Sequence, residues 1–176
     1  PDVLVSAVTA RFAAHAIRKV FELDWKPMHF VTSGASSVSS TIMPVGPERA
    51  LGLITSTYIK DPSDPAWASD AGMKDYFAFM AKYYGDGNPK EFLNAYGYTV
   101  TSVLRKLLEQ CNGNFARASI MAQANNLKNL EVPTLLPGVR VNTSPTNHHP
   151  LRQMQLQRWD GKGYVRFGSI IEGANL

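Results

Sequence analysis

Cysteine and long apolar runs are scarce in this sequence, and each shortage excludes a class of protein. Cys111 is the single cysteine in 176 residues, so the chain has no internal disulfide framework and no cysteine pair for a zinc site. No stretch approaches the roughly 20 apolar residues that cross a bilayer as a helix. The net charge is only +4, with acidic and basic residues interspersed, which gives no reason to expect a nucleic-acid partner.

Signatures of catalysis and of cofactor binding are missing as well. No glycine-rich phosphate loop of the nucleotide-binding type occurs, and we expect no cofactor. His148 and His149 form the only histidine cluster, but adjacent side chains point apart and no third ligand lies at a suitable spacing, so we expect no metal site. The serine-rich residues 33–40 lack the Gly-x-Ser-x-Gly elbow of hydrolases, and no catalytic residue is predicted.

The composition is that of a folded chain. Apolar residues make up 44% and charged residues 18%, which is typical of a globular protein and not of a disordered one. The length suits one domain or pieces of two. Pro1 and Asp2 lead directly into a predicted strand, and from this we expect the chain to begin inside a longer protein, with any export signal upstream.

The first third of the chain predicts a strand–helix–strand unit. Val3–Ser6 has the character of a short buried strand, and Ala10–Trp25 carries apolar residues at helical spacing on one face. Thr9 is a suitable N-cap, and Pro27 ends the helix before a second strand, Met28–Thr32. This order predicts parallel strands joined by a right-handed crossover.

The remaining elements alternate with polar connections. Residues 60–65, which contain two prolines, are the best candidate for a boundary or an interlobe crossing. We expect the 91–111 helix to bury a face that includes Val100, Val103, Leu104, Leu107 and Leu108. The predicted elements are a strand over Leu51–Ser56, helices over Asp70–Tyr84, Glu91–Cys111 and Phe115–Gln123, and a β-hairpin of Met154–Trp159 with Tyr164–Phe167.

Two strand ends carry small and polar residues that suit ligand binding. In an open α/β sheet, ligands bind beyond the carboxyl ends of the strands. Here these ends are residues 7–9 and 33–36, and helices that begin near them offer free N–H groups to an anion or a carbonyl oxygen. Thr9, Ser33, Gly34 and Ala35 are therefore candidate ligand contacts, although ordinary loops with helix caps account for the same pattern.

Several stretches carry a resemblance to a known family. They are residues 2–36, residues 50–54, the Asn-Ala-Tyr-Gly-Tyr stretch at 94–98, and the tail segments 136–146 and 153–162, of which the tail is the most specific. Together they resemble the type I periplasmic solute-binding proteins of ABC importers, the leucine/isoleucine/valine-binding family, over essentially the whole chain. Tyr96, in the matched helix start, joins the candidate ligand contacts by this resemblance.

The resemblance implies an architecture and a role. The fold class is α/β, the C-terminal part of a two-lobed fold with a parallel sheet, flanking helices and a C-terminal β-hairpin. Residues 1–58 would belong to the second lobe, 59–150 to the helical first-lobe segment and crossover, and 151–176 to a hairpin returning to the second lobe. The protein would be a non-enzymatic receptor in the periplasm that closes on a solute and delivers it to an ABC permease of the inner membrane.

One departure from the family bears on the ligand. Amino-acid-binding members place an acidic residue just after the strand that corresponds to Met28–Thr32, whereas residues 33–38 contain none and the next acid is Glu48. A desolvated ammonium without a partner is costly, so we expect a small aromatic or aliphatic carboxylate without an α-amine. A ligand-sensing regulatory domain of the same fold, or a small serine hydrolase using Ser33 or Ser36, remain as alternatives.

A chain made of parts of two lobes also predicts its own associations. Unpaired sheet edges and apolar helix faces seek partners. We therefore expect this chain to self-associate or to pair with the missing N-terminal segment of the same protein.

Overall fold

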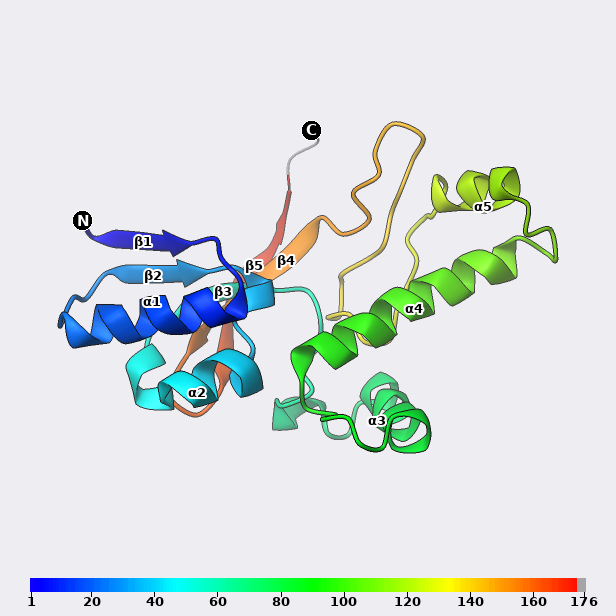
Figure 1. Ribbon diagram of the computed structural model, residues 1–176. Helices are drawn as coiled ribbons and strands as arrows, with labels where there is room; N and C mark the ends of the chain where they lie inside the picture. Colours follow the sequence, from blue (N-terminus) through cyan, green and yellow to red (C-terminus); the bar gives the residue numbers. More distant parts are fainter. Residues whose placement is uncertain (174–176) are drawn as a thin grey trace.

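The protein folds into a mixed sheet flanked by helices on one side and a separate group of helices beyond its end (Figure 1). The computed structural model describes residues 1–173. The sheet has five strands in the order β1-β2-β3-β4-β5. The strands are β1 Val3–Ser6, β2 Met28–Val31, β3 Ile54–Thr57, β4 Gln153–Trp159 and β5 Tyr164–Glu172, and the helices are α1 Ala10–Glu22, α2 Met43–Val45, α3 Ala71–Tyr83, α4 Phe92–Gln110 and α5 Arg117–Ala124. Short 3-10 helices cover Ser33–Ala35, Pro47–Ala50 and Pro65–Trp67, and a π-helical turn covers Val38–Ile42.

The predicted strand–helix–strand unit is confirmed. β1 pairs with β2 in parallel, with Val3 opposite Met28 and Ser6 opposite Val31. Helix α1 ends at Glu22, three residues before the predicted end, because Asp24 turns the chain with a φ of 49°. Thr9 occupies the N-cap position, but its side chain makes no capping hydrogen bond, so the predicted hydroxyl cap is wrong.

The last three strands turn the sheet from parallel to antiparallel. β3 pairs with β2 in parallel and with β4 in antiparallel fashion, and β4 and β5 form the predicted hairpin. β3 was expected from Leu51, but a 3-10 helix and Gly52, with a φ of 84°, delay the strand until Ile54. β5 continues five residues past the predicted end at Phe167, to Glu172.

One core lies between the sheet and the helices that follow β1 and β2. Ala13 and Ile17 of α1 belong to one buried cluster with Val31 of β2 and Trp159 of β4. The Trp159 indole N–H donates to the carbonyl of Pro47 at 2.9 Å, so the 3-10 helix is fixed to the sheet. We call this cluster the sheet core.

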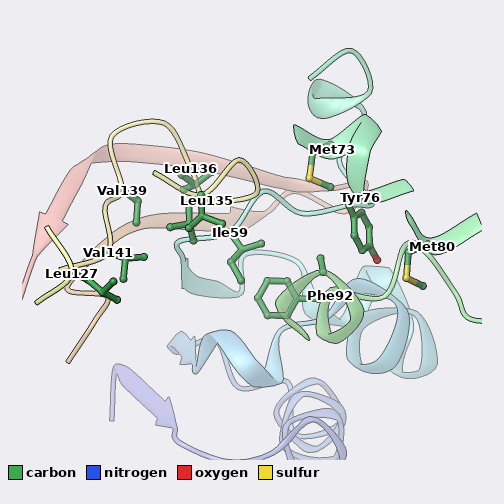
Figure 2. Packing of buried hydrophobic residues seen from close by; sticks show 12 residues of the cluster. Ile59, Met73, Tyr76, Met80, Phe92, Leu127, Leu135, Leu136, Val139 and Val141 are labelled. Atoms are coloured by element: carbon green, nitrogen blue, oxygen red, sulfur yellow. The ribbon is translucent and has the colours of Figure 1, made fainter. Parts of the chain in front are cut away.

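A second core lies among the separate helices and the two chain segments that connect them to the sheet. We call residues 58–64 the first crossing and residues 125–152 the second crossing. Its members include Met73, Tyr76 and Met80 of α3 and Phe92 of α4, which Figure 2 shows beside Ile59 of the first crossing. The second crossing contributes the buried residues Val132, Leu135, Leu136, Val139 and Val141. We call this cluster the helical core.

The buried face of α4 differs from the prediction. Of the predicted face, Leu107 is buried and Val103 is partly buried, while Val100 and Leu104 are about half exposed. The helix instead turns inward the row that contains Phe92, Ala95 and Thr99, and the Thr99 hydroxyl lies 2.6 Å from that of Thr134. Val100 directly follows Thr99, and successive side chains of a helix point in different directions around its axis. Val100 and Leu104 therefore face solvent beside the buried row.

Among residues 1–173, helices cover one face of the sheet and leave the other uncovered. α1 and the turns around α2 lie against one face (Figure 1), and residues of the opposite face alternate with those of the sheet core. On that opposite face Val3, Val5, Met28 and Val165 are each at least half exposed. We call this surface the open sheet face, and it is unusual because parallel strands are normally covered on both faces.

Candidate functional site

The carboxyl ends of β1 and β2 lie side by side, as the parallel pairing requires. The Thr32 hydroxyl donates to the carbonyl of Val8 at 3.2 Å, which joins the two ends. Beyond them Thr9 and Gly34 are exposed and Ser33 is half-buried, so all three are accessible from the same edge of the sheet. The structure thus brings together the candidates that the sequence placed at two strand ends.

Ala35 and Tyr96 are placed differently from that group. Ala35 is fully buried in the sheet core, so its side chain packs against protein atoms in this conformation. Tyr96 lies on α4 and is 41% exposed, outside the helical core. Burial raises the pKa of Tyr58, which lies at the start of the first chain crossing.

A carboxylate that the sequence did not associate with this region lies next to the loop after β2. The Ser37 hydroxyl donates to Glu91 Oε1 at 2.9 Å, and the Ser39 hydroxyl donates to Glu91 Oε2. Glu91 is also the N-cap of α4, where Oε1 accepts from the N–H of Leu93 at 3.4 Å. In the sequence its only signal was its position at a helix start, because nothing linked it to serines more than 50 residues earlier.

A second carboxylate lies at the first crossing, in the wall of a small cavity. Burial raises the pKa of Asp61 above its ordinary value, although hydrogen bonds from the hydroxyl and N–H of Ser63 oppose this rise. The cavity holds about 120 Å³ and is also lined by Tyr164 and Arg166. The Tyr164 hydroxyl is buried and, among residues 1–173, has no partner at hydrogen-bonding distance and angle, which suits a water molecule or a polar ligand group in the cavity.

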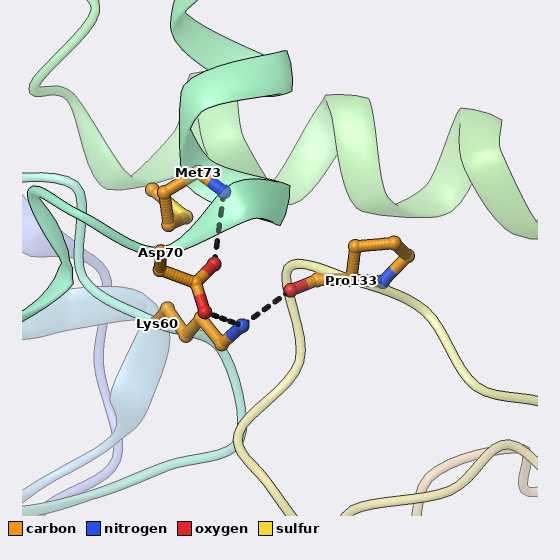
Figure 3. A network of polar contacts seen from close by, with 4 residues as sticks. All are labelled: Lys60, Asp70, Met73 and Pro133. Atoms are coloured by element: carbon orange, nitrogen blue, oxygen red, sulfur yellow. Dashed lines mark hydrogen bonds and ion pairs between the residues drawn. The ribbon is translucent and has the colours of Figure 1, made fainter.

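The first crossing is fixed to the helical group by a buried lysine (Figure 3). Lys60 Nζ donates to Asp70 Oδ2 at 2.8 Å and to the carbonyl of Pro133 at 2.6 Å, and the lysine side chain is only 8% exposed. Asp70 caps α3 by accepting from the N–H of Met73 at 3.0 Å. One ammonium group therefore connects the first crossing, the start of α3 and the second crossing.

An aromatic residue lies beside this lysine. Lys60 Nζ is 5.4 Å from the centre of the Trp67 ring, and the guanidinium carbon of Arg166 in β5 is 4.4 Å from the same centre. Cations at these distances are attracted by the electron-rich ring face. We call the contacts of Lys60 with Asp70 and Pro133 the joint, and Trp67 links this joint to the hairpin of the sheet.

The geometry offers no catalytic arrangement at the serines. Ser36 donates to the carbonyl of Ser33 at 2.9 Å, and no histidine or acidic side chain within residues 1–173 hydrogen-bonds to either serine. His29, the histidine of β2, is buried and pairs with the Ser6 hydroxyl at 2.9 Å instead. Burial lowers the pKa of His29, which favours its neutral form.

Two further searches cover the described part of the chain. No group of three or more His, Cys, Asp or Glu side chains within residues 1–173 is placed to hold a metal ion. None of the helices described is both long and apolar enough to cross a membrane.

The fold defines a class of protein, that of α/β proteins with a mixed sheet and flanking helices, and a sequence profile defines the family. The profile of the family described as "Periplasmic binding protein" matches residues 1–164, so the chain belongs to this family. Membership in a family of binding proteins agrees with the prediction of a receptor that is not an enzyme. None of the curated proteins compared with the chain matches it in sequence.

Solved structures show the same fold at low sequence identity. A branched-chain amino acid ABC transporter protein from Thermus thermophilus, solved with bound valine, superposes with a TM-score of 0.81 at 15% identity over 98% of this chain and 46% of its own. A leucine-binding protein from Thermotoga maritima superposes with a TM-score of 0.69 at 19% identity over 98% of this chain and 45% of its own. An ABC transporter substrate-binding protein from Aeropyrum pernix gives a TM-score of 0.79 at 11% identity over 99% and 45%. The chain therefore spans less than half the length of these structures.

Proposed function

We propose that the chain is part of an extracytoplasmic receptor, working in the periplasm, that binds a small solute and delivers it to an ABC permease. The observation that supports this most directly is the accessible edge formed by Thr9, Ser33 and Gly34 in a chain of the periplasmic binding protein family. We assign residues 1–58 and 151–176 to one lobe and residues 59–150 to the other. The two separate cores support this division, because each lies mainly within one of the proposed lobes.

For the ligand we propose a small carboxylate without an α-amine, either aromatic or aliphatic. Residues 33–38 offer hydroxyl and N–H donors and no acid, which suits a carboxylate and gives an ammonium group no partner within the loop. Thr9, Ser33, Gly34 and Ala35 are the proposed contacts on one side of the cleft, and Tyr96 the contact on the other.

An amino-acid ligand is the second candidate, and the structure gives it a specific argument. Glu91 contacts Ser37 and Ser39 at the end of the acid-free loop, and Asp61 lies nearby at the first crossing. However, the serine hydroxyls already bind both oxygens of Glu91, and burial favours the neutral form of Asp61. For these reasons we place the amine-free carboxylate first.

A matched pair of compounds tests the ligand class. 4-Methylpentanoate and leucine differ only by the α-amine, and benzoate adds an aromatic acid. In calorimetric titrations of the intact protein, including whatever precedes residue 1, we expect binding of at least one amine-free acid and none of leucine at the same concentration. Tight binding of leucine with no binding of either acid would overturn the proposal in favour of the amino-acid candidate.

The open sheet face requires a cover, and we propose that it is a further segment of the same polypeptide. The compared structures are about twice as long as this chain, and the valines of the face are exposed on strands of a kind that helices normally cover. Residues 1–176 alone should therefore self-associate, with a second copy taking the place of that segment. Light scattering of this chain against the intact protein tests the proposal, and a monodisperse monomer of residues 1–176 would contradict it.

A further inference from the structure

The loop after β2 and the helical group meet through one carboxylate. Glu91 accepts from Ser37 at 2.9 Å and from Ser39. Within the described chain, no other side-chain hydrogen bond or ion pair joins residues 1–57 to residues 65–125. The helical core includes buried residues of both crossings but none of residues 33–42, so it does not hold the loop against the helical group.

The serines that bind Glu91 also shape the loop. The Ser37 oxygen accepts from the N–H of Ser40 at 3.3 Å and so caps the π-helical turn Val38–Ile42. The Ser37 and Ser39 hydroxyls lie 3.3 Å apart, so both converge on the same carboxylate. Because residues 33–36 immediately precede this turn, a change at Glu91 reaches the proposed ligand contacts through the backbone.

Glu91 is equally well connected on the other side. As the N-cap of α4 it fixes the first turn of that helix, and Tyr96 lies five residues further along the same helix. The carboxylate thus belongs to both walls of the proposed cleft. Hydrogen bonds to a charged acceptor are stronger than those between neutral groups, which makes this connection stronger than an ordinary serine contact.

We propose that Glu91 is a positioning residue of the ligand site, which holds the loop of residues 33–39 in register with the start of α4. This inference rests on the proposed function, since it assigns Glu91 a role in binding without direct contact to the ligand. The role requires two effects from its removal, namely a loosened loop in the free protein and a weaker affinity at the strand ends. If Glu91 stabilises the loop but has no part in binding, its removal loosens the loop and leaves the affinity unchanged.

The variants are chosen to separate the carboxylate from its surroundings. Glu91→Ala removes both acceptors, Glu91→Gln keeps one oxygen that still accepts from a serine, and Ser39→Ala removes one donor. Ser40→Ala and Lys90→Ala are the matched controls, because both residues are exposed and their side chains make no hydrogen bond in residues 1–173. All are made in the intact protein.

Hydrogen exchange of the free protein gives the first readout. We expect Glu91→Ala, which removes the acceptors of both serine hydroxyls, to speed exchange of the amides of residues 37–42 by at least about tenfold, since tenfold corresponds to the loss of one charge-assisted hydrogen bond. Glu91→Gln should give a smaller increase, and the amides of α1 should keep their rates in every variant. Unchanged rates in the loop, or an equal increase throughout the protein, would overturn the proposal.

Titration with 4-methylpentanoate and leucine gives the second readout. Whichever of the two the parent protein binds, Glu91→Ala should weaken its affinity about tenfold, with Glu91→Gln between the two and the controls unchanged. An affinity that stays constant while the loop loosens would remove Glu91 from the site. If the parent binds neither compound, the same comparison is made with benzoate. Binding of none of the three would overturn the proposed ligand class alone, and the exchange rates of the loop would then decide the role of Glu91.

Discussion

The two cores of the molecule differ in how completely their own residues enclose them. The helical core buries large side chains from α3, α4 and both crossings, and Met73, Tyr76 and Ile59 are fully enclosed. The sheet core also encloses large side chains, among them Trp159 and Ile17, but within residues 1–173 the helices that contribute to it cover one face of the sheet. Within the described residues the sheet part thus leaves a face of its strands exposed, which we have proposed is covered by a further segment of the polypeptide.

Removing the ammonium group at the joint should have the largest effect on stability. Lys60→Met keeps the aliphatic stem but leaves the partly buried Asp70 and the carbonyl of Pro133 without their donor, and loss of a hydrogen bond to a charged group costs about 1.5–3 kcal/mol. Urea unfolding measures this loss. Lys74→Met, at an exposed position of α3, should change the free energy of unfolding by less than about 0.5 kcal/mol, and equal effects of the two substitutions would refute the role of the joint.

Two helix glycines give a sharper test of how tightly the helical core is packed. A Cβ at Gly72 in α3 would lie 2.5 Å from Cβ of Pro133, whereas a Cβ at Gly97 in α4 would meet no atom within 4 Å. Gly72→Ala should therefore destabilise the protein by about 1–3 kcal/mol through overpacking. Gly97→Ala should stabilise it by about 0.5–1 kcal/mol through helix propensity, and thermal unfolding that shows the same sign for both would contradict this packing.

Acid should change the contributions of Asp70 and Asp61 to stability in opposite directions. Burial alone would raise the pKa of Asp70, but the bonds from Lys60 and from backbone N–H groups outweigh it and lower the pKa below its ordinary 3.8. Its stabilising contribution is therefore complete above that pH and is lost as the pH falls through the lowered value. The pKa of Asp61 is raised, so its charged form opposes folding at neutral pH and this cost disappears on acidification.

The corresponding asparagine variants measure these contributions. At pH 7 Asp70→Asn should lower the free energy of unfolding and Asp61→Asn should raise it. As the pH is lowered from 7 to 3, the Asp61→Asn difference should disappear first, above 3.8, and the Asp70→Asn difference should shrink only below 3.8. Denaturant unfolding across this range tests the signs. A pH-independent difference for Asp70→Asn would mean that its charge does not contribute.

The smallest effect on stability is expected at the open sheet face. Val5→Thr and Val165→Thr replace exposed side chains that have no packing to lose, so each should change the free energy of unfolding by less than about 0.5 kcal/mol. In residues 1–176 alone, the pair should nevertheless reduce self-association, because the apolar surface is smaller. Sedimentation velocity at several concentrations compares the variants. Unchanged association would place the contact elsewhere.

The same contrast explains what could be predicted from the sequence. The β1–α1–β2 unit follows from local signals, since Pro27 and the apolar spacing of α1 both lie within the unit. Thr9, Ser33 and Gly34 could be placed at one edge because parallel strands end together. Whether these residues contact a ligand remains a prediction.

The contacts between distant segments could not be read from the sequence. Lys60 lies in a polar stretch that suggested only a boundary, and its partners Asp70 and Pro133 are brought to it by tertiary packing. Glu91 could be recognised as a helix start but not as the partner of Ser37. Val100 and Leu104 were misassigned because the apolar residues of α4 extend around more of the helix than the helical core covers.

Trp67, held between Lys60 and Arg166, has an optical consequence. The chain has three tryptophans, and of the other two, Trp159 is enclosed in the sheet core while Trp25 follows the end of α1. An indole with cations over its ring changes its emission when their distance changes, because the excited state responds to the local electric field. Emission from Trp67 therefore gives the protein a built-in signal for movement at the joint, and with Trp25 and Trp159 replaced by phenylalanine it would report such movement without an attached dye.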